Sequence, residues 1–191
     1  MNEALGAFAA LRRRRRAKRP VEEPERCDLC AQQVPADHRH LFDPQERQLV
    51  CACGPCAILF PWQAKARYKE VPRETRRLAE YALSDADWDA LMIPINIAFF
   101  VRSAGRVTAF YPSPAGAMAS SLDVSDLPLV PLLDDVEALV INRLGEPQYW
   151  VLPIDHCYRL VGIIRSKWRG LSGGDEVWDA VGRFFAELRD A

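Results

Sequence analysis

Short stretches rich in β-branched and aromatic residues recur along the chain between turn signals, a pattern that predicts β-strands. Turn signals at Asp43–Glu46 and Ser103–Gly105 each separate two such stretches, which predicts two hairpins. Pro112–Gly116 is expected to end the strand that precedes it. The expected strands are 41–43, 48–50, 67–71, the last part of 93–101, 106–111, 136–142 and 148–152.

Helical patterns occur once before the second hairpin and again in the C-terminal region. Ser84 is a good N-cap for a short helix that ends near Leu91. Asp155 is expected to cap the helix that opens the C-terminal region. After Gly174, apolar residues recur every three or four positions, which predicts an amphipathic helix with one face in the core. The residues of that face are Val177, Val181, Phe184, Phe185 and Leu188.

Charge is unevenly distributed along the chain. The 191 residues have a formal net charge of −1, but residues 1–20 carry a net charge of +6, so the remainder carries −7. Residues 1–26, which include Arg12–Arg16, are therefore expected to form a flexible basic arm. Such an arm suits contact with an acidic protein, with nucleic acid or, peripherally, with an anionic membrane surface. The acidic balance of the remainder argues against nucleic acid, because nucleic-acid-binding domains are usually basic.

The N-terminal region also bears on where the protein is found. Its basic residues follow the apolar ones, which is the reverse of a secretory signal. No apolar run reaches the roughly 18 residues that a transmembrane helix requires. We therefore expect a cytoplasmic protein, in which clustered cysteines bind metal ions rather than form disulfides.

Five of the six cysteines fall between Cys27 and Cys56. They include two Cys-x-x-Cys pairs separated by 22 residues, a spacing typical of tetrahedral sites with four thiolate ligands. The hairpin expected between the pairs would bring them together, as in a zinc ribbon. A helical turn expected at 57–60 would then pack on the body of the protein. The sequence thus predicts a zinc site whose ligands are Cys27, Cys30, Cys53 and Cys56.

Three further residues in this stretch offer ligand atoms. In an extended strand Cys51 would share the face of Cys53, so it could replace Cys53 as a ligand. His38 and His40 also share one face of an extended segment. Either histidine could supply the fourth ligand or donate a hydrogen bond to a ligand sulfur. The sequence leaves these alternatives open.

Iron competes with zinc for the same thiolates, as in a rubredoxin-like electron carrier. Cys-x-x-Cys pairs of that kind are normally followed by glycine, whereas Ala31 and Ala57 follow here, which favours zinc. A catalytic zinc site needs an open coordination position and a nearby general base. The sequence has no His-Glu-x-x-His motif to supply them, so we assign no catalytic residue.

A set of motifs spread along the chain is distinctive in combination. The motifs are Cys27-x-x-Cys30, His38-Arg39-His40-Leu41, Cys51-x-Cys53-x-x-Cys56, Ala98-Phe99-Phe100, Phe110 to Gly116, Trp150 to Asp155 and Trp168 to Gly174. Together they resemble a bacterial family of small proteins of unknown function. Its members are commonly encoded beside the genes of nickel–iron uptake hydrogenases in high-GC Gram-positive bacteria. The resemblance covers residues 27–189 and implies a role associated with the hydrogenase, without an established activity.

These patterns predict an α+β fold in three parts. The parts are the basic arm (1–26), a zinc-ribbon-like module (27–63) and a body (64–191) with an antiparallel sheet and C-terminal helices packed on it. The expected function is that of a non-enzymatic zinc-binding accessory protein in the assembly, maturation or docking of a nickel–iron hydrogenase. Its partner would be a hydrogenase subunit or a maturation factor. The alternatives are a rubredoxin-like iron protein that serves the same hydrogenase and a nucleic-acid-binding zinc-ribbon protein.

Overall fold

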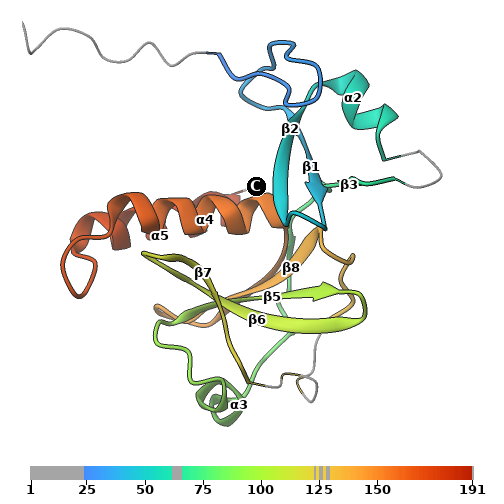
Figure 1. Ribbon diagram of the computed structural model, residues 1–191. Helices are drawn as coiled ribbons and strands as arrows, with labels where there is room; N and C mark the ends of the chain where they lie inside the picture. The colour runs from blue at the N-terminus through green and yellow to red at the C-terminus, as the bar shows by residue number, and fades with distance from the viewer. Residues whose placement is uncertain (1–23, 62–65, 123, 125–126, 128–129, 191) are drawn as a thin grey trace, which may run out of the picture.

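The computed structural model describes residues 24–61, 66–122, 124, 127 and 130–190 (Figure 1). This part of the chain contains one antiparallel sheet of three strands and one of six. Helices α4 (Ile154–Lys167) and α5 (Asp175–Asp190) pack side by side, and α4 covers one face of the larger sheet. The fold is α+β with an N-terminal cysteine cluster, antiparallel sheets and C-terminal helices, as predicted. The expected basic arm lies outside the described residues as far as residue 23.

The N-terminal module is built on the first predicted hairpin. Strands β1 (Arg39–Asp43) and β2 (Gln48–Ala52) pair antiparallel, and helix α2 (Gly54–Leu59) follows them. In the turn between the strands, a carboxylate oxygen of Asp43 accepts hydrogen bonds from the backbone N–H groups of Gln45 (3.0 Å) and Glu46 (3.3 Å). Strand β3 (Lys69–Glu70) is shorter than expected and pairs with β1. The three-stranded sheet therefore includes residues of the segment that was expected to form the first part of the body.

The larger sheet has the strand order β4-β9-β8-β5-β6-β7. The hairpin expected around Ser103–Gly105 forms as β5 with β6, and the strands expected at 136–142 and 148–152 pair as β8 with β9. The strands are β4 (Arg76–Arg77), β5 (Ile97–Ser103), β6 (Arg106–Ser113), β7 (Gly116–Ala119), β8 (Glu137–Asn142) and β9 (Gln148–Pro153). Among the described residues no helix is both long and apolar enough to cross a bilayer.

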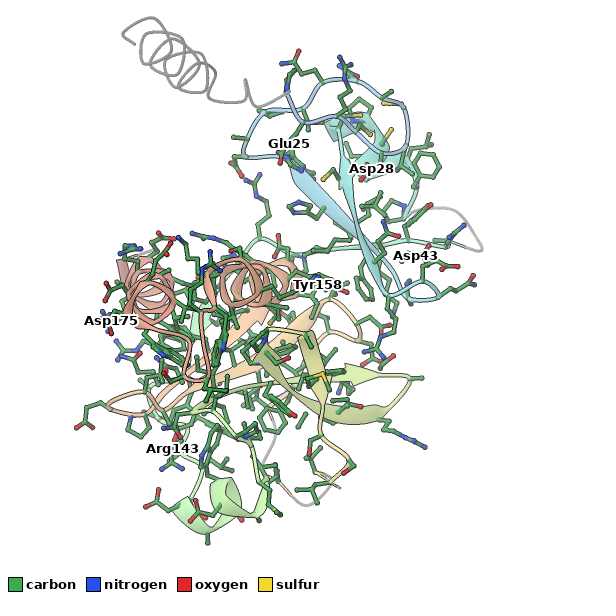
Figure 2. The ribbon with its side chains drawn as sticks, turned by 60° about the vertical axis from the view of Figure 1, so that its left-hand side comes forward. Glu25, Asp28, Asp43, Arg143, Tyr158 and Asp175 are labelled. Carbon is green, nitrogen blue, oxygen red and sulfur yellow. The ribbon has the colours of Figure 1, made fainter. Side chains whose placement is uncertain are left out.

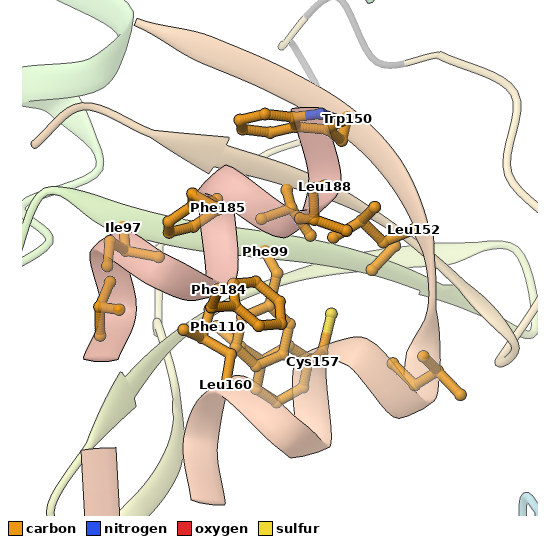
Figure 3. Packing of buried hydrophobic residues seen from close by; sticks show 14 of the residues in the cluster. Ile97, Phe99, Phe110, Trp150, Leu152, Cys157, Leu160, Phe184, Phe185 and Leu188 are labelled. Carbon is orange, nitrogen blue, oxygen red and sulfur yellow. The ribbon is translucent and has the colours of Figure 1, made fainter. Parts of the chain in front are cut away.

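Both faces of the larger sheet are buried. Alternate residues along each strand point to opposite faces, so each strand contributes side chains to two cores. In β8, Ala138 and Val140 lie in the core under α4 and α5, whereas Leu139 and Ile141 lie in a second core on the other face. Figure 3 shows Phe184 and Phe185 of α5 in the first of these cores. The second core is closed by the short helix α3 (Asp85–Ala90), whose N-cap is Ser84, as predicted.

Two expected boundaries in this body are shifted. The preceding strand does end within Pro112–Gly116, but at Ser113, because β6 continues through Pro112 before it turns into β7. On the side of β7, Pro112 lies between two hydrogen-bonded pairs of the ladder. On the side of β5, it lies beyond the last residue that pairs. The N–H that proline lacks would therefore have made no ladder hydrogen bond. The second shift concerns Asp155, which is not an N-cap. The N-cap is Pro153, two residues earlier, so helix α4 begins at Ile154 and Asp155 lies in its first turn.

The turn between α4 and α5 provides a test of the fold. Gly173 has a φ of +92°, and a Cβ atom there would lie 2.8 Å from a methyl group of Val177. We expect Gly173→Ala to lower the free energy of unfolding by about 1–3 kcal/mol, because it combines an unfavourable φ with a clash. Gly182→Ala is the matched control, since Gly182 lies within α5 with open space around it. The control should raise the free energy of unfolding by about 0.5–1 kcal/mol. Urea denaturation measures both, and equal effects of the two substitutions would contradict the structure.

Candidate metal centre

The first pair of cysteines lies in a tight turn formed by residues 25–34. The N–H of Cys27 donates to the carbonyl of Gln32, and the N–H of Ala31 donates to the carbonyl of Cys27, both over 2.8 Å. Ala31 has a φ of 62°, the left-handed conformation that usually requires glycine. Alanine therefore adopts here the conformation that glycine provides in other turns of this kind. The identity of this residue does not discriminate between zinc and iron.

The second pair lies where β2 gives way to α2. Cys53 is the extended N-cap of the helix, and Cys56 lies in its first turn, where Pro55 sets the backbone. Residues three apart at a helix start lie on the same side of it, so the two sulfurs converge. Ala57 is buried in the module's own apolar cluster. Helix α2 thus packs on β1 and β2 of its own module, whereas packing on the body was expected.

The hairpin brings the two pairs together into one cluster of four sulfurs. The Sγ atoms of Cys27, Cys30, Cys53 and Cys56 all lie within 4.8 Å of one another. The Cys30 and Cys53 sulfurs are 3.7 Å apart, close to the edge of about 3.8 Å that a tetrahedral ion with 2.3 Å metal–sulfur bonds requires. All four cysteines are free thiols, and only Cys30 of the four is exposed. The four thiols therefore fit a tetrahedral metal ion, whose identity the geometry leaves open.

Comparison with known proteins bears on this chain through one match. Residues 26–191 match a family of unknown function, DUF5947. The chain belongs to this family. No curated protein and no solved structure matches it. Membership of DUF5947 brings no activity with it, so the chemistry of the cluster rests on its residues.

In this DUF5947 protein the pKa of Cys27 is shifted in the opposite direction to those of Cys30 and Cys56. Burial raises the pKa of Cys27, but hydrogen bonds from the backbone N–H groups of Cys53, Leu29 and Cys30 outweigh burial and lower the pKa to about 6. Burial and the neighbouring thiols raise the pKa of Cys56. The pKa of Cys30 is lowered by the backbone at Gln32 but raised by the Cys27 thiol, by burial and by Cys53, with a net rise. One ligand is thus a preformed thiolate near neutral pH, and at least two others must lose protons when metal binds.

Cys51, His38 and His40 form a cluster of their own. One ligand atom from each lies within 4.8 Å of those of the other two. Cys51 pairs with His40 across the hairpin, so their side chains lie on one face, the same face as Phe42. Leu41, the residue between His40 and Phe42, packs instead in the apolar cluster that contains the four-cysteine site. Cys53 groups with the other three cysteines and Cys51 groups with the two histidines, so Cys51 does not take the place of Cys53 in the four-cysteine cluster.

The backbone of Cys51 is nevertheless tied to the first cysteine turn. Its N–H donates to the carboxylate of Asp28 (2.6 Å), and its carbonyl accepts from the N–H of Asp28 (2.9 Å). Burial and the negative charges of Asp28 and Glu25 raise the pKa of the Cys51 thiol. Glu25 and Asp28 lie in the same part of the module as its sulfur atoms (Figure 2). The cysteine turn and the second cluster are therefore positioned together.

Sequence reasoning missed the contribution of Asp155 to this region. One of its carboxylate oxygens lies 3.0 Å from Nδ1 of His40, a residue 115 positions earlier. Burial raises the pKa of Asp155, but the hydrogen bond from His40 and the nearby histidines lower it overall. Asp155 is therefore ionised at neutral pH. No local signal could have revealed this pair, because it depends on how the module docks on α4.

A separate cavity of about 360 Å³ lies between the hairpin turn, the β5–β7 strands and α4. Its lining is largely apolar and includes Phe42, Phe99 and Phe110, with Arg47 and Arg165 among its polar residues. Cys157 also lines it, and burial raises the pKa of that thiol, which makes it a poor nucleophile. His38, His40 and Cys51 do not line this cavity. The cavity and the metal-ligating clusters are thus distinct features.

The pKa shifts of Cys27, Cys30 and Cys56 predict a steep pH dependence of metal binding. Above pH 6, zinc should displace at least the two protons held by Cys30 and Cys56. Zinc affinity should therefore fall about 100-fold or more for each unit by which the pH is lowered from 8 to 6.5. Below pH 6, protonation of Cys27 should steepen the loss further. Competition with a chelator of known affinity at several pH values measures this slope, and a slope below one proton would contradict the assigned ligands.

Proposed function

We propose that this protein is a non-enzymatic, zinc-binding accessory protein that acts in the assembly, maturation or docking of a nickel–iron hydrogenase. The observation that carries the non-enzymatic part is the closure of the four-cysteine cluster. Four sulfurs within 4.8 Å of one another would occupy every position of a four-coordinate ion and leave none for a substrate or water. Such a site stabilises a fold and does not perform chemistry. The hydrogenase role is supported by the motifs that resemble proteins encoded beside hydrogenase genes.

Zinc is preferred over iron because small modules with two Cys-x-x-Cys pairs most often hold a structural zinc ion. The exposure of Cys30 favours the rubredoxin-like alternative. An exposed ligand brings the ion near the surface, where a redox partner could exchange electrons with it. The metal bound in iron-replete cells therefore decides between the two functions.

We expect protein purified from iron-replete cells to be colourless and to contain zinc in its four-cysteine site. Elemental analysis and visible absorption measure this directly. Cys53→Ser should lose that zinc, whereas Cys157→Ala, which removes a thiol outside the cluster, should retain it. A red protein whose absorption bleaches on reduction would show that the site carries iron and would replace the structural function with electron transfer.

A partner-binding role requires an exposed surface, and α2 provides one. Ile58 and Leu59 are adjacent on this helix and are 61% and 60% exposed. Two neighbouring apolar side chains that are exposed to solvent on a rigid module are suited to a protein interface. The cysteine cluster lies at the start of the same helix, so the ion would hold this surface in shape.

We expect the full-length protein to co-purify with a subunit or a maturation factor of the hydrogenase when both are expressed in the native host. The double substitution Ile58→Glu and Leu59→Glu should weaken this association at least 10-fold without loss of zinc, because it places charges in an apolar interface. Leu171→Glu is the matched control, since Leu171 is fully exposed and lies outside the module. Recovery of no hydrogenase component with the unsubstituted protein would contradict the proposed role.

A further inference from the structure

We propose that His38, His40 and Cys51 form a second metal site, separate from the four-cysteine site, which binds a divalent transition-metal ion of the zinc class and leaves one coordination position open. One ligand atom from each residue lies within 4.8 Å of the other two. The three come from the two strands of one hairpin and the residue before it. The site does not depend on the hydrogenase role.

Each histidine has one nitrogen committed to an acceptor and the other free for a metal. Nδ1 of His38 lies 2.9 Å from the carbonyl oxygen of Pro35. Nδ1 of His40 lies 3.0 Å from a carboxylate oxygen of Asp155. A carbonyl and an ionised carboxylate can only accept, so both Nδ1 atoms carry the proton. In neutral imidazoles the lone pair is then on Nε2, which is the atom that commonly binds a metal.

The Nε2 atom of His38 is an independent sign of a missing ligand. It is buried, and no described residue gives it a hydrogen-bond partner. The side chain of His38 is only 5% exposed, so water does not solvate the ring freely. Buried polar atoms are nearly always paired in folded proteins. A metal ion between His38, His40 and Cys51 would supply the partner that this nitrogen lacks.

The surroundings of the two histidines match those of histidines that bind metals. Such histidines usually donate their second N–H to a carboxylate or a backbone carbonyl, which fixes the ring and raises its basicity. Here Asp155 performs this function for His40, and Pro35 performs it for His38. Asp155 acts on the metal only through His40, so it is a positioning residue. Its position in α4 also means that the second site lies where the module meets the body.

The ligand set suggests the class of metal and the state of the site. Two imidazoles and one thiolate suit zinc, cobalt or nickel better than magnesium or calcium, which prefer oxygen. Bonds of about 2.0–2.3 Å would require the three ligand atoms to approach to about 3.4–3.7 Å. Three protein ligands leave a fourth position for water or for a side chain of a partner. His40 and Asp155 are about one quarter exposed, so that position can be reached from solvent.

Cobalt is a suitable probe, because its visible spectrum reports both geometry and the number of thiolate ligands. Full-length protein that holds one equivalent of zinc in the four-cysteine site is titrated with Co²⁺ under reducing conditions. The unsubstituted protein should bind a second ion with the spectrum of a site with a single thiolate. His38→Ala, His40→Ala and Cys51→Ser should each weaken the second ion at least 100-fold and retain the zinc. The retained zinc shows that each variant is folded.

Asp155→Asn and His156→Asn separate positioning from general disturbance. The first should weaken the second ion 10- to 100-fold, because the amide no longer fixes the proton on Nδ1 of His40. The second should leave both ions unchanged, because His156 is the remaining histidine and lies outside the cluster. Binding of only one ion by the unsubstituted protein would overturn the proposal. So would a second ion unaffected by His40→Ala and Cys51→Ser, or loss of the zinc itself in these variants, which would place them in the first site.

Discussion

The register of the β1–β2 hairpin determines where the ligand atoms of the module lie. Partners across an antiparallel pair point to the same face, and neighbours along a strand point to opposite faces. Leu41 and Val50 are paired and face the four-cysteine cluster, whereas Phe42 and Leu49, one step along, pack toward the core of the body. A slip of one residue would exchange the two faces. It would turn Phe42 toward the four-cysteine cluster and remove the hairpin from the body.

The two ends of the molecule depend on different sources of stability. The body buries both faces of a six-stranded sheet, so apolar burial alone can hold it. The module has only a small apolar cluster, in which three of the buried side chains are cysteines. A structural zinc ion contributes about 10–16 kcal/mol in peptides of this kind, and this free energy becomes folding free energy. Phe42 and the hydrogen bond from Tyr158 to the carbonyl of Arg47 (2.7 Å) then join the module to the body.

Local features of this chain could be predicted from its sequence, and contacts between distant segments could not. The cysteine spacing, the Asp43 turn and the Ser84 cap each depend on a few neighbouring residues, and all three are present in the structure. The pairing of β3 with β1 and the contact of Asp155 with His40 depend on docking, which no local pattern encodes.

The case of Cys51 is different, because α2 begins directly after β2. Cys51 lies opposite His40 in the hairpin, whereas Cys53 is the N-cap of α2 and joins the other three cysteines. Pro112 shows the same limit from the other side, since the rule that proline ends a strand depends on which ladder bond its N–H would have made. In both cases the position of the strand end decided the outcome, and strand ends are the part of a secondary-structure prediction that a sequence specifies least.

The two metal sites make different demands on the fold, and this gives them an order. The four thiolates come from two short turns and the hairpin between them, so an ion can bind there while the module itself folds. The second site needs the hairpin already in register, to bring Cys51 opposite His40, and needs α4 in place, so that Asp155 can fix the proton on His40. It is therefore complete only after the module has docked on the body. On this proposal, an ion at the first site governs whether the module is folded, whereas an ion at the second site favours the docked arrangement.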